Sequence, residues 1–430
     1  MSARLLIGDV YDRMTEIPDG SIDLVVTSPP FLALRSYLPA DHPLKAKEIG
    51  SEATPADFLD TLLALTAEWG RVLAPHGSIC VELGDTYSGS GGAGGDYNAD
   101  GLRAGQQKFS GSARKRAENG VTDGGRPSRS GRGDGWPLAK SLTGIPTLYA
   151  WCLAYGRNLL TGEPSPAGRW RIRNVIVWAR PNPPVGALGD KFRPATSYIT
   201  VATRASDRWF DLDAVRVPAD PANKRQSVLK REGIGGRTDQ VMSPLGPDGQ
   251  RVISNPAGAP PLDWHADEHP EDGDWLWKLP TAPYKGSHYA TFPKALPKRL
   301  IEAMCPRQVC EGCGEPRRRI VEKSPDYAEA RAQVGGFKGE RSRGDGLNGT
   351  TQYVEGRHID RAENLTVGWT TCDCPDPTYR TGIVLDPFAG SGTTLEVATG
   401  LGRDCIGIDL DERNADLARD RVGMFLEVVA

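Results

Sequence analysis

The most informative segment of the sequence is IVLDPFAGSGTT, residues 383–394. Its apolar start, Ile383–Leu385, predicts a buried strand, and Leu395–Gly400 beyond it predicts a helix. Gly390 and Gly392 let the backbone between them turn tightly and approach a ligand closely. The first turn of the helix offers unpaired N–H groups beside that turn. The stretch therefore predicts a ligand-binding strand–turn–helix unit of an open α/β sheet.

The residues around this turn narrow the class of ligand. Two threonines follow Gly392, so the spacing is not the G-x-G-x-x-G of dinucleotide folds, which disfavours a nicotinamide-dependent dehydrogenase. The segment Asp386–Phe388 has no role in binding a pyrophosphate, whereas a carboxylate at Asp386 suits a cationic ammonium group. The methionine end of S-adenosylmethionine carries such a group. A further predicted strand, Cys405–Ile408, ends at Asp409, where an acid suits the two hydroxyls of a ribose.

A second motif lies near the other end of the chain. Residues Thr27–Phe31, TSPPF, close the predicted strand Ser21–Ser28 with a rigid Pro-Pro turn, and open α/β sheets bind ligands at such strand ends. The Ser28 hydroxyl and a backbone carbonyl can both accept hydrogen bonds from an amino group. Phe31 offers a flat face on which a base can stack. Without the glycine-rich loop, an ordinary Pro-Pro turn would be the favoured interpretation.

Strands and helices alternate through much of the remaining chain, which favours a parallel sheet with helices on its faces. Thr54-Pro55 is typical of a helix start, and APHG, residues 74–77, is expected to end that helix. The other predicted elements are strands at Leu5–Gly8, Ser78–Leu83, Asn174–Ala179 and Ser197–Ala205, and helices at Thr147–Gly156 and Glu412–Phe425.

Length and composition limit the number of domains and the class of protein. The 430 residues allow one large α/β domain with insertions, or two to three domains. A hydrophobic fraction of 38%, with 51 glycines and 34 prolines, predicts long loops. A net charge of -3 does not indicate a nucleic-acid binder, although a local basic face is compatible with it. The sequence contains no signal-peptide core and no apolar run long enough for a membrane span, so a reducing cytosol is expected.

Taken together, SPPF and DPFAGSGTT resemble the DNA amino-methyltransferases, which methylate cytosine N4 or adenine N6. Their order along the chain resembles the permuted beta class of that family. Three further blocks are similar to the family: residues 8–31, residues 178–186 with 192–211, and residues 288–304. The resemblance implies an α/β, permuted Rossmann-like S-adenosylmethionine-dependent methyltransferase fold with polar insertions.

The resemblance also implies roles for matching residues. The target base would be held by Ser28, Pro29, Pro30 and Phe31. The cofactor would be bound by Asp386, Pro387, Phe388, Gly390, Gly392, Thr393 and Asp409, with Asp9 near its adenine ring and His288, Thr291, Phe292 and Pro293 in a lid. Serine at the first position of the tetrapeptide favours cytosine N4 over adenine N6 in this family, with exceptions. The base, unreachable inside a duplex, should be flipped into the site.

Four cysteines form two closely spaced pairs, and a small metal-binding insertion is expected around them. The pairs are Cys310 with Cys313, and Cys372 with Cys374. Four thiolates arranged in this way can complete a tetrahedral, structural zinc site, although C-x-C is less common than C-x-x-C and reduced, unliganded thiols are the alternative. Cys305 is a spare candidate ligand, and Cys405 is expected to pack in the core.

Composition, the cysteine pairs and the family resemblance together predict a division of the chain. Residues 1–85, 141–217 and 379–430 would form the catalytic core, with 86–140 a flexible Gly/Ser/Arg-rich insertion, 218–274 a target-recognition region, 275–305 the cofactor lid and 306–378 the zinc insertion.

The partner would be double-stranded DNA in a bacterial cytoplasm, whether the gene is bacterial or phage-borne. A cognate restriction endonuclease and a homodimer are open possibilities. The alternatives are a methyltransferase acting on RNA or a small molecule, and a non-catalytic DNA-binding relative.

Overall fold

A computed structural model describes residues 2–34, 37–39, 41–88, 135–181, 192–216, 277, 279, 292–323 and 364–429. The chain divides into two compact units. The first comprises Met1–Phe210, Asp263–Pro316 and Asp376–Ala430, and the second comprises Asp211–Leu262 and Arg317–Pro375. Among the described residues, no helix has the length and apolar character needed to cross a membrane.

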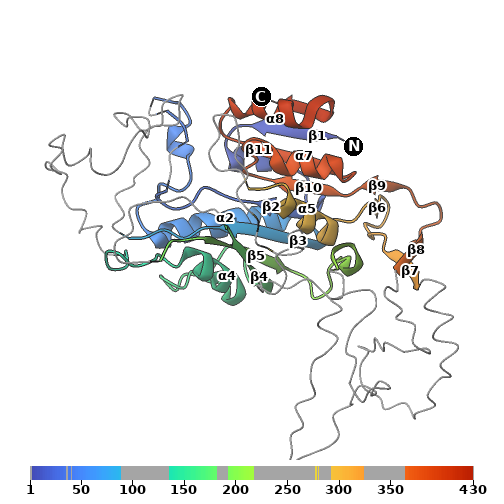
Figure 1. The fold of residues 1–430 in the computed structure, drawn as a ribbon, viewed down its shortest axis with the longest axis horizontal. Helices are drawn as coiled ribbons and strands as arrows, with labels where there is room; N and C mark the ends of the chain where they lie inside the picture. The colour runs from blue at the N-terminus through green and yellow to red at the C-terminus, as the bar shows by residue number, and fades with distance from the viewer. Residues whose placement is uncertain are drawn as a thin grey trace, which may run out of the picture. The chain divides into compact units, whose positions relative to one another are not determined.

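The first unit is built on an eight-stranded sheet in the order β12-β1-β11-β10-β2-β3-β5-β4 (Figure 1). Neighbouring strands from β12 to β3 run parallel, and β5 and β4 continue the sheet with antiparallel pairing. The strands are β1 (Ala3–Ile7), β2 (Ile22–Thr27), β3 (Leu73–Leu83), β4 (Arg171–Ala179), β5 (Thr196–Thr203), β10 (Ile383–Asp386), β11 (Asp404–Asp409) and β12 (Leu426–Val429).

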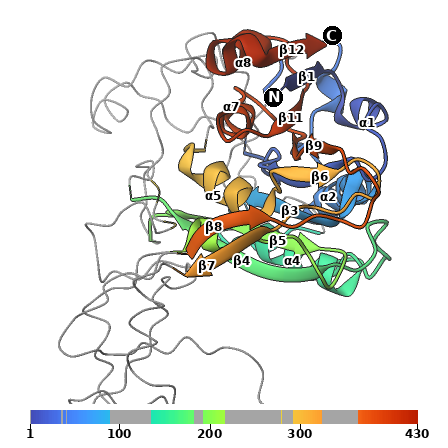
Figure 2. The same ribbon diagram turned by 90° about the vertical axis from the view of Figure 1, so that its right-hand side faces the viewer.

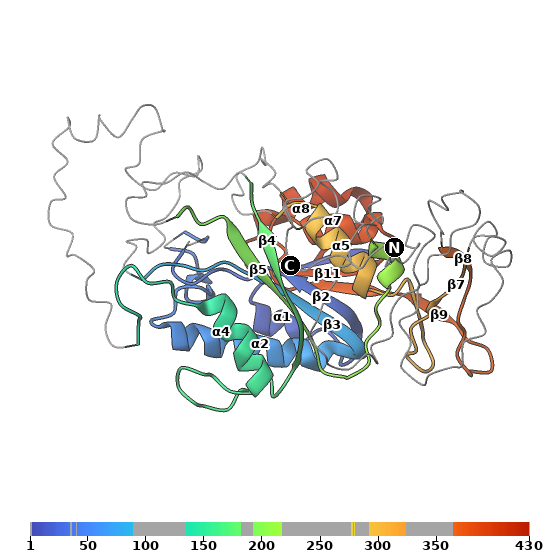
Figure 3. The same cartoon turned by 60° about the horizontal axis from the view of Figure 1, so that its bottom comes forward.

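Helices cover both faces of this sheet (Figure 3). One layer contains α1 (Val10–Met14), α2 (Pro55–Val72) and α4 (Ile145–Tyr155), and the other contains α5 (Ala295–Met304), α7 (Thr393–Gly400) and α8 (Asn414–Val422). Short 3₁₀ helices are η1 (Lys45–Lys47), η2 (Leu212–Val215) and η4 (Gly423–Phe425). This three-layer arrangement confirms the predicted α/β fold class, because a parallel sheet must bury both of its faces.

Local sequence explains where α2 begins and what it buries. The Thr54 side chain accepts from the Asp57 backbone N–H while the Asp57 carboxylate accepts from the Thr54 backbone, so two N–H groups at the helix start are satisfied. The apolar face that follows includes Phe58 and Trp69, both fully buried. They belong to the main core beneath β2 and β3, which anchors the strands that carry the SPPF turn.

Two small antiparallel pairs complete the described structure. In the first unit, β6 (Gln308–Cys310) pairs with β9 (Tyr379–Thr381), and the two lie side by side in Figure 2. The described part of the second unit contains the pair of β7 (Arg319–Lys323) and β8 (Asn364–Trp369). There the Arg319 guanidinium contacts the Asp211 carboxylate, with an Nε–Oδ2 distance of 3.0 Å.

The predicted elements are present, and most of their bounds lie within three residues of those expected. Two of the differences have a clear physical cause. APHG, expected to end a helix, instead lies inside β3, because the helix already ends at Val72 and the backbone extends from Leu73. The helix predicted to reach Phe425 ends at Val422, since Gly423 takes a φ of 68°. The residues after Phe425 form β12, which adds the outermost strand beside β1.

Candidate active site and metal centre

The two sequence motifs end neighbouring strands of the sheet. Strand β2 pairs in parallel with β10, with Leu24 opposite Val384 and Val25 opposite Leu385. Because parallel strands finish at the same edge, the turn after β2 and the glycine-rich loop after β10 start side by side. The Thr27 hydroxyl donates to Oδ1 of Asp386 at 2.8 Å, which ties the two motifs together.

Asp386 is buried at the end of β10. Its Oδ2 accepts from the Thr394 hydroxyl at 2.6 Å, and its Oδ1 also accepts from the Phe388 backbone N–H at 3.2 Å. Burial raises the pKa of Asp386 to about 6, although the hydrogen bonds from Thr394 and Thr27 act in the opposite direction. The carboxylate is therefore held rigidly at the start of the glycine-rich loop, where it would lose much of its charge in mild acid.

Asp409 occupies the equivalent position on the next strand, β11. Its Oδ2 accepts from the Gly390 backbone N–H at 2.7 Å, and its Oδ1 accepts from the Asn414 side chain at 2.9 Å and the Asp411 backbone at 2.8 Å. Burial is the main cause that raises the pKa of Asp409 to about 6. This carboxylate fixes the shape of the loop that follows Asp386.

The glycine-rich loop retains unused polar groups. Gly390 and Gly392 have φ values of 52° and 79°, a region that side chains disfavour, so glycine is required there. The Ser391 hydroxyl is buried and has no hydrogen-bond partner among the described residues. An unsatisfied buried hydroxyl is rare in a folded protein, so it indicates a polar ligand at this loop. Thr393, the first residue of α7, accepts from the Arg421 guanidinium at 2.8 Å.

Among the residues predicted near the cofactor's adenine ring and in its lid, the described part of the chain includes Asp9, Phe292 and Pro293. Asp9 directly follows Gly8, whose N–H donates to the Asp409 carbonyl, so it lies beside the end of β11. Its carboxylate caps α1 by accepting from the Tyr11 backbone N–H at 3.1 Å. Phe292 is half-buried just before α5. His288 and Thr291 lie outside the described residues.

Ser28 donates its hydroxyl proton to Oε2 of Glu82 at 2.5 Å. Glu82 lies in β3 with only 4% of its surface exposed. Burial raises the pKa of Glu82. The Ser28 hydroxyl, the Ser197 hydroxyl and the positive charge of Arg180 each lower that pKa, but their combined effect is smaller than that of burial. With its proton committed to Glu82, the Ser28 oxygen is left to accept a hydrogen bond from another group.

The Phe31 ring of the SPPF turn packs against a glycine of the neighbouring segment. A Cβ built on Gly84 would lie 2.5 Å from Cε2 of Phe31, so the ring packs directly against that glycine. Phe31 and Phe388 also pack against the same hydrophobic core. The other side of the turn is closely covered as well, since a Cβ on Gly50 would lie 3.0 Å from the Phe31 carbonyl oxygen and 3.3 Å from Pro30.

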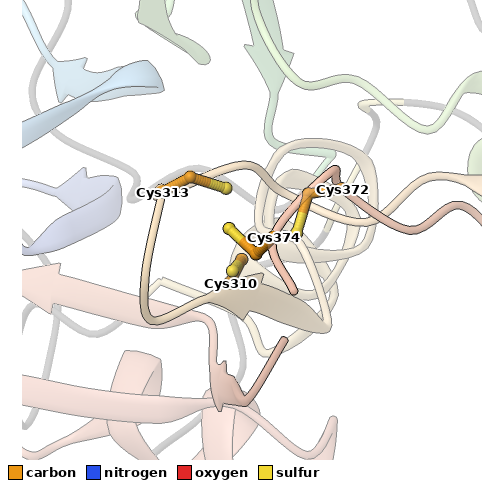
Figure 4. Close-up of side chains that lie close together, drawn as sticks. All are labelled: Cys310, Cys313, Cys372 and Cys374. Carbon is orange, nitrogen blue, oxygen red and sulfur yellow. The ribbon is translucent and has the colours of Figure 1, made fainter. Parts of the chain in front are cut away.

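The four predicted metal ligands converge. The sulfur atoms of Cys310, Cys313, Cys372 and Cys374 all lie within 4.8 Å of one another, and the side chains point toward a common centre (Figure 4). A tight turn presents the first pair, because the Gly314 backbone N–H donates to the Cys310 carbonyl at 2.9 Å. This donor set is that of a structural zinc site.

The remaining cysteines lie apart from this cluster. All eight cysteines belong to the described part of the chain, and none forms a disulfide. Cys305, the spare candidate ligand, is buried against Gly382 and is not one of the four clustered cysteines. Cys405 is buried in the sheet, as expected of a core residue.

Three residues were missed by the sequence analysis: Thr27 as a partner of Asp386, Glu82 as the acceptor of the Ser28 hydrogen bond, and Arg180 as a positive charge that interacts with Glu82. The strand SICVEL was recognised, but the charge within that apolar run was not singled out. A carboxylate in a strand that is otherwise buried requires a partner, and that signal would have identified Glu82.

Comparison with known proteins agrees with the geometry. The model of a family described as DNA methylase matches residues 22–309 and 376–420. The type II methyltransferase M.SfiI of Streptomyces fimbriatus is 25% identical over 95% of this chain and 88% of its own length. The type II methyltransferase M.SmaI of Serratia marcescens is 22% identical over 98% and 91%. A solved structure, the PvuII DNA methyltransferase (cytosine-N4-specific), aligns with a TM-score of 0.46 at 12% identity, covering 98% of this chain and 86% of that one.

Proposed function

The chain belongs to the DNA methylase family, whose members transfer a methyl group from S-adenosylmethionine to cytosine N4 or adenine N6, and we propose that it methylates cytosine N4 in double-stranded DNA. The observation that carries the proposal is the hydrogen bond from Thr27 to Asp386, because it joins the residue before the base-binding turn to the start of the cofactor loop. A methyl donor and an amine held by these two motifs would face each other.

The cofactor loop fits S-adenosylmethionine in its chemistry. When bound, the cofactor supplies an electrophilic methyl group on a sulfonium. The carboxylate of Asp386 would attract its ammonium group, and Asp409 would accept from its ribose hydroxyls. The buried Ser391 hydroxyl, which has no hydrogen-bond partner among the described residues, offers a further polar contact. These groups act by holding the donor in one orientation, and positioning of this kind supplies much of the barrier reduction for a direct transfer.

The SPPF turn would prepare the amine. An exocyclic amine is a poor nucleophile because its lone pair is conjugated with the ring. The Ser28 oxygen, whose proton is donated to Glu82, and the Pro29 carbonyl would accept hydrogen bonds from the two N–H bonds. Acceptors placed there favour a pyramidal nitrogen and stabilise the positive charge that develops on it during attack. Phe31 would stack on the flipped base.

Product identification tests this proposal. The purified protein would be incubated with duplex DNA and tritiated S-adenosylmethionine, and the DNA would then be digested to nucleosides for mass spectrometry. The proposal predicts N4-methylcytosine. N6-methyladenine would establish the alternative of the same class. Label transferred to RNA, or to no nucleic acid at all, would contradict the proposal.

We also propose that the four clustered cysteines bind one structural zinc ion. Support comes from the convergence of four sulfur atoms, which as thiolates satisfy a tetrahedral Zn²⁺ without leaving a position for water. The ion would connect the segment around Cys310 with the segment around Cys372. A partner restriction endonuclease, a homodimer and the target-recognition role of residues 218–274 stay predictions, and the last lies outside the described residues.

A further inference from the structure

Polar side chains line the catalytic edge of four neighbouring strands. Ser28 follows β2, Glu82 lies near the end of β3, Ser197 near the start of β5, and Arg180 directly after β4. The pairing of these strands brings the four positions to the same edge, because β5 runs opposite to both β3 and β4. We call these four residues the polar row. It extends from the base-binding turn toward the outer strand of the sheet.

Arg180 is held at the far end of this row. Its backbone N–H donates to the Ala195 carbonyl at 2.7 Å, one guanidinium nitrogen donates to the Thr196 carbonyl at 2.9 Å, and the guanidinium lies 5.4 Å from the centre of the Trp178 ring. These contacts fix the planar group in one place. Its Nε is nevertheless buried and has no hydrogen-bond partner among the described residues. The fixed guanidinium thus retains an unused donor.

Glu82 supplies the matching charge in the middle of the row. Its carboxylate is close enough to Arg180 for their opposite charges to interact, and its Oε1 has no hydrogen-bond partner within the described ranges. Buried charged groups normally satisfy all their donors and acceptors. The polar row thus has an unused donor, Arg180 Nε, at one end, and the Ser28 oxygen can accept a hydrogen bond at the other end. Such a row suits a ligand that presents a hydrogen-bond donor followed by acceptors.

We propose that Arg180 is a specificity-determining residue that donates hydrogen bonds to N3 and O2 of the flipped cytosine. This inference rests on the proposed function. Cytosine presents its amine, N3 and O2 in a row, whereas adenine presents its amine and N1 and then a C–H. A guanidinium can donate two parallel hydrogen bonds to adjacent acceptors. Adenine would leave one of those donors unpaired, which a buried site penalises.

The first test requires no variant. Methylation sites are mapped in the DNA of a host that expresses the protein, and a duplex carrying one site is made with cytosine or 3-deazacytosine at the target position. The analogue keeps the amine and O2 but lacks the N3 acceptor. Its kcat/KM is expected to fall by about tenfold or more, the loss typical of one hydrogen bond to a charged donor. An unchanged kcat/KM would overturn the inference.

The second test adds Arg180→Gln, with Arg173→Gln as its matched control. Arg173 is exposed on the same strand and donates to the Ser206 carbonyl, so its replacement should leave kcat/KM within about twofold of wild type. Arg180→Gln should lower kcat/KM on cytosine by at least about tenfold, with S-adenosylmethionine affinity unchanged, and should lose most of the discrimination against 3-deazacytosine. Full activity of Arg180→Gln would overturn the inference.

The outcomes separate the two levels of the proposal. If the wild-type product is N6-methyladenine, both the proposed base and the role of Arg180 fail. If the product is N4-methylcytosine but neither the analogue nor Arg180→Gln changes kcat/KM, only the role of Arg180 fails. If Arg180→Gln does not fold, as judged by its thermal unfolding, the measurement of wild-type protein on 3-deazacytosine still decides.

Discussion

Thr27 and Asp386 lie 359 positions apart in the sequence, yet the hydroxyl of one donates to the carboxylate of the other at 2.8 Å. Both side chains are buried at the ends of adjacent parallel strands. This hydrogen bond thus joins the end of β2, just before the SPPF turn, to the end of β10, where the glycine-rich loop begins.

Thr27→Val tests this coupling. Valine keeps the shape but removes the donor, which leaves a buried carboxylate short of one hydrogen bond and should cost about 1–3 kcal/mol of unfolding free energy in urea. S-adenosylmethionine affinity should weaken in parallel. Thr15→Val, at an exposed position just after α1, is the matched control and should change neither quantity by more than about 0.5 kcal/mol. If the two variants have the same free energy of unfolding, the hydrogen bond from Thr27 to Asp386 does not contribute to stability.

Ser28→Ala separates catalysis from cofactor binding. Loss of an acceptor that acts on developing charge should lower kcat by roughly 10²-fold or more, by analogy with the loss of one oriented hydrogen-bonding group. S-adenosylmethionine affinity, measured by calorimetry, should stay within about twofold, because the proposed cofactor contacts all lie outside the SPPF turn. Ser21→Ala, at the opposite end of β2, is the control. Full turnover by Ser28→Ala would remove its proposed role.

Cofactor binding should depend on pH. Because burial raises the pKa of Asp386 from 3.8 to about 6, folding favours its protonated form, and this contribution to stability is lost as pH rises from about 4 to 6. Attraction to an ammonium group needs the ionised form, so S-adenosylmethionine affinity should rise with pH through about 6. Asp386→Asn should bind more weakly and lose part of this dependence. The remainder would come from Asp409, whose pKa is also raised to about 6. A flat profile for the wild-type protein would contradict the assignment.

Metal analysis should find about one zinc ion per chain after purification without chelators. Cys313→Ser should lower that content and the temperature of unfolding, because a structural ion contributes directly to folding. Glu311→Gln, an exposed neighbour in the same turn, should keep the zinc. If the purified wild-type protein contains no zinc, the proposed metal site is wrong, and the four cysteines are reduced thiols without a metal.

A buried ion pair stabilises the other end of β2. Asp23 is fully buried and accepts from two Arg380 nitrogens at 2.6 and 3.0 Å, and His76 lies 2.9 Å away. Burial alone would raise the pKa of Asp23, but the hydrogen bonds from His76 and Arg380 outweigh it and hold that pKa below its usual range. The stability from this pairing is present above the ordinary pKa and is lost as pH falls through the lowered one.

Arg380→Met should therefore destabilise the protein by about 3 kcal/mol, because it leaves a buried carboxylate without its main partner. Arg4→Met is the contrasting control. Arg4 pairs with Glu427 at 3.5 Å, but both side chains are largely exposed, and such pairs contribute at most about 1 kcal/mol. Denaturant unfolding of the two variants at pH 7 gives the comparison, and similar losses would contradict the role of burial.

The sequence predicted the fold class and the members of both motifs because these depend on local chemistry. Apolar runs of strand length, glycines at required turns and a proline pair are visible along the chain. The apolar pattern predicted a helix that ends at Phe425, whereas the helix ends at Val422. Apolar residues continue on both sides of Gly423, so the pattern alone does not show that the helix ends at this glycine. It also left β12 unrecognised, because four residues at the end of the chain give too short a pattern.

The amino-acid sequence alone supplied the residue types proposed to bind a cofactor and a base: a carboxylate, glycines, a serine and an aromatic ring near strand ends. The hydrogen bond from Ser28 to Glu82, and the closeness of Arg180 to the Glu82 charge, followed only from the folded sheet. The physical reason is that strand order and register set these neighbours. Both result from packing the whole sheet between two helix layers, which no local pattern encodes.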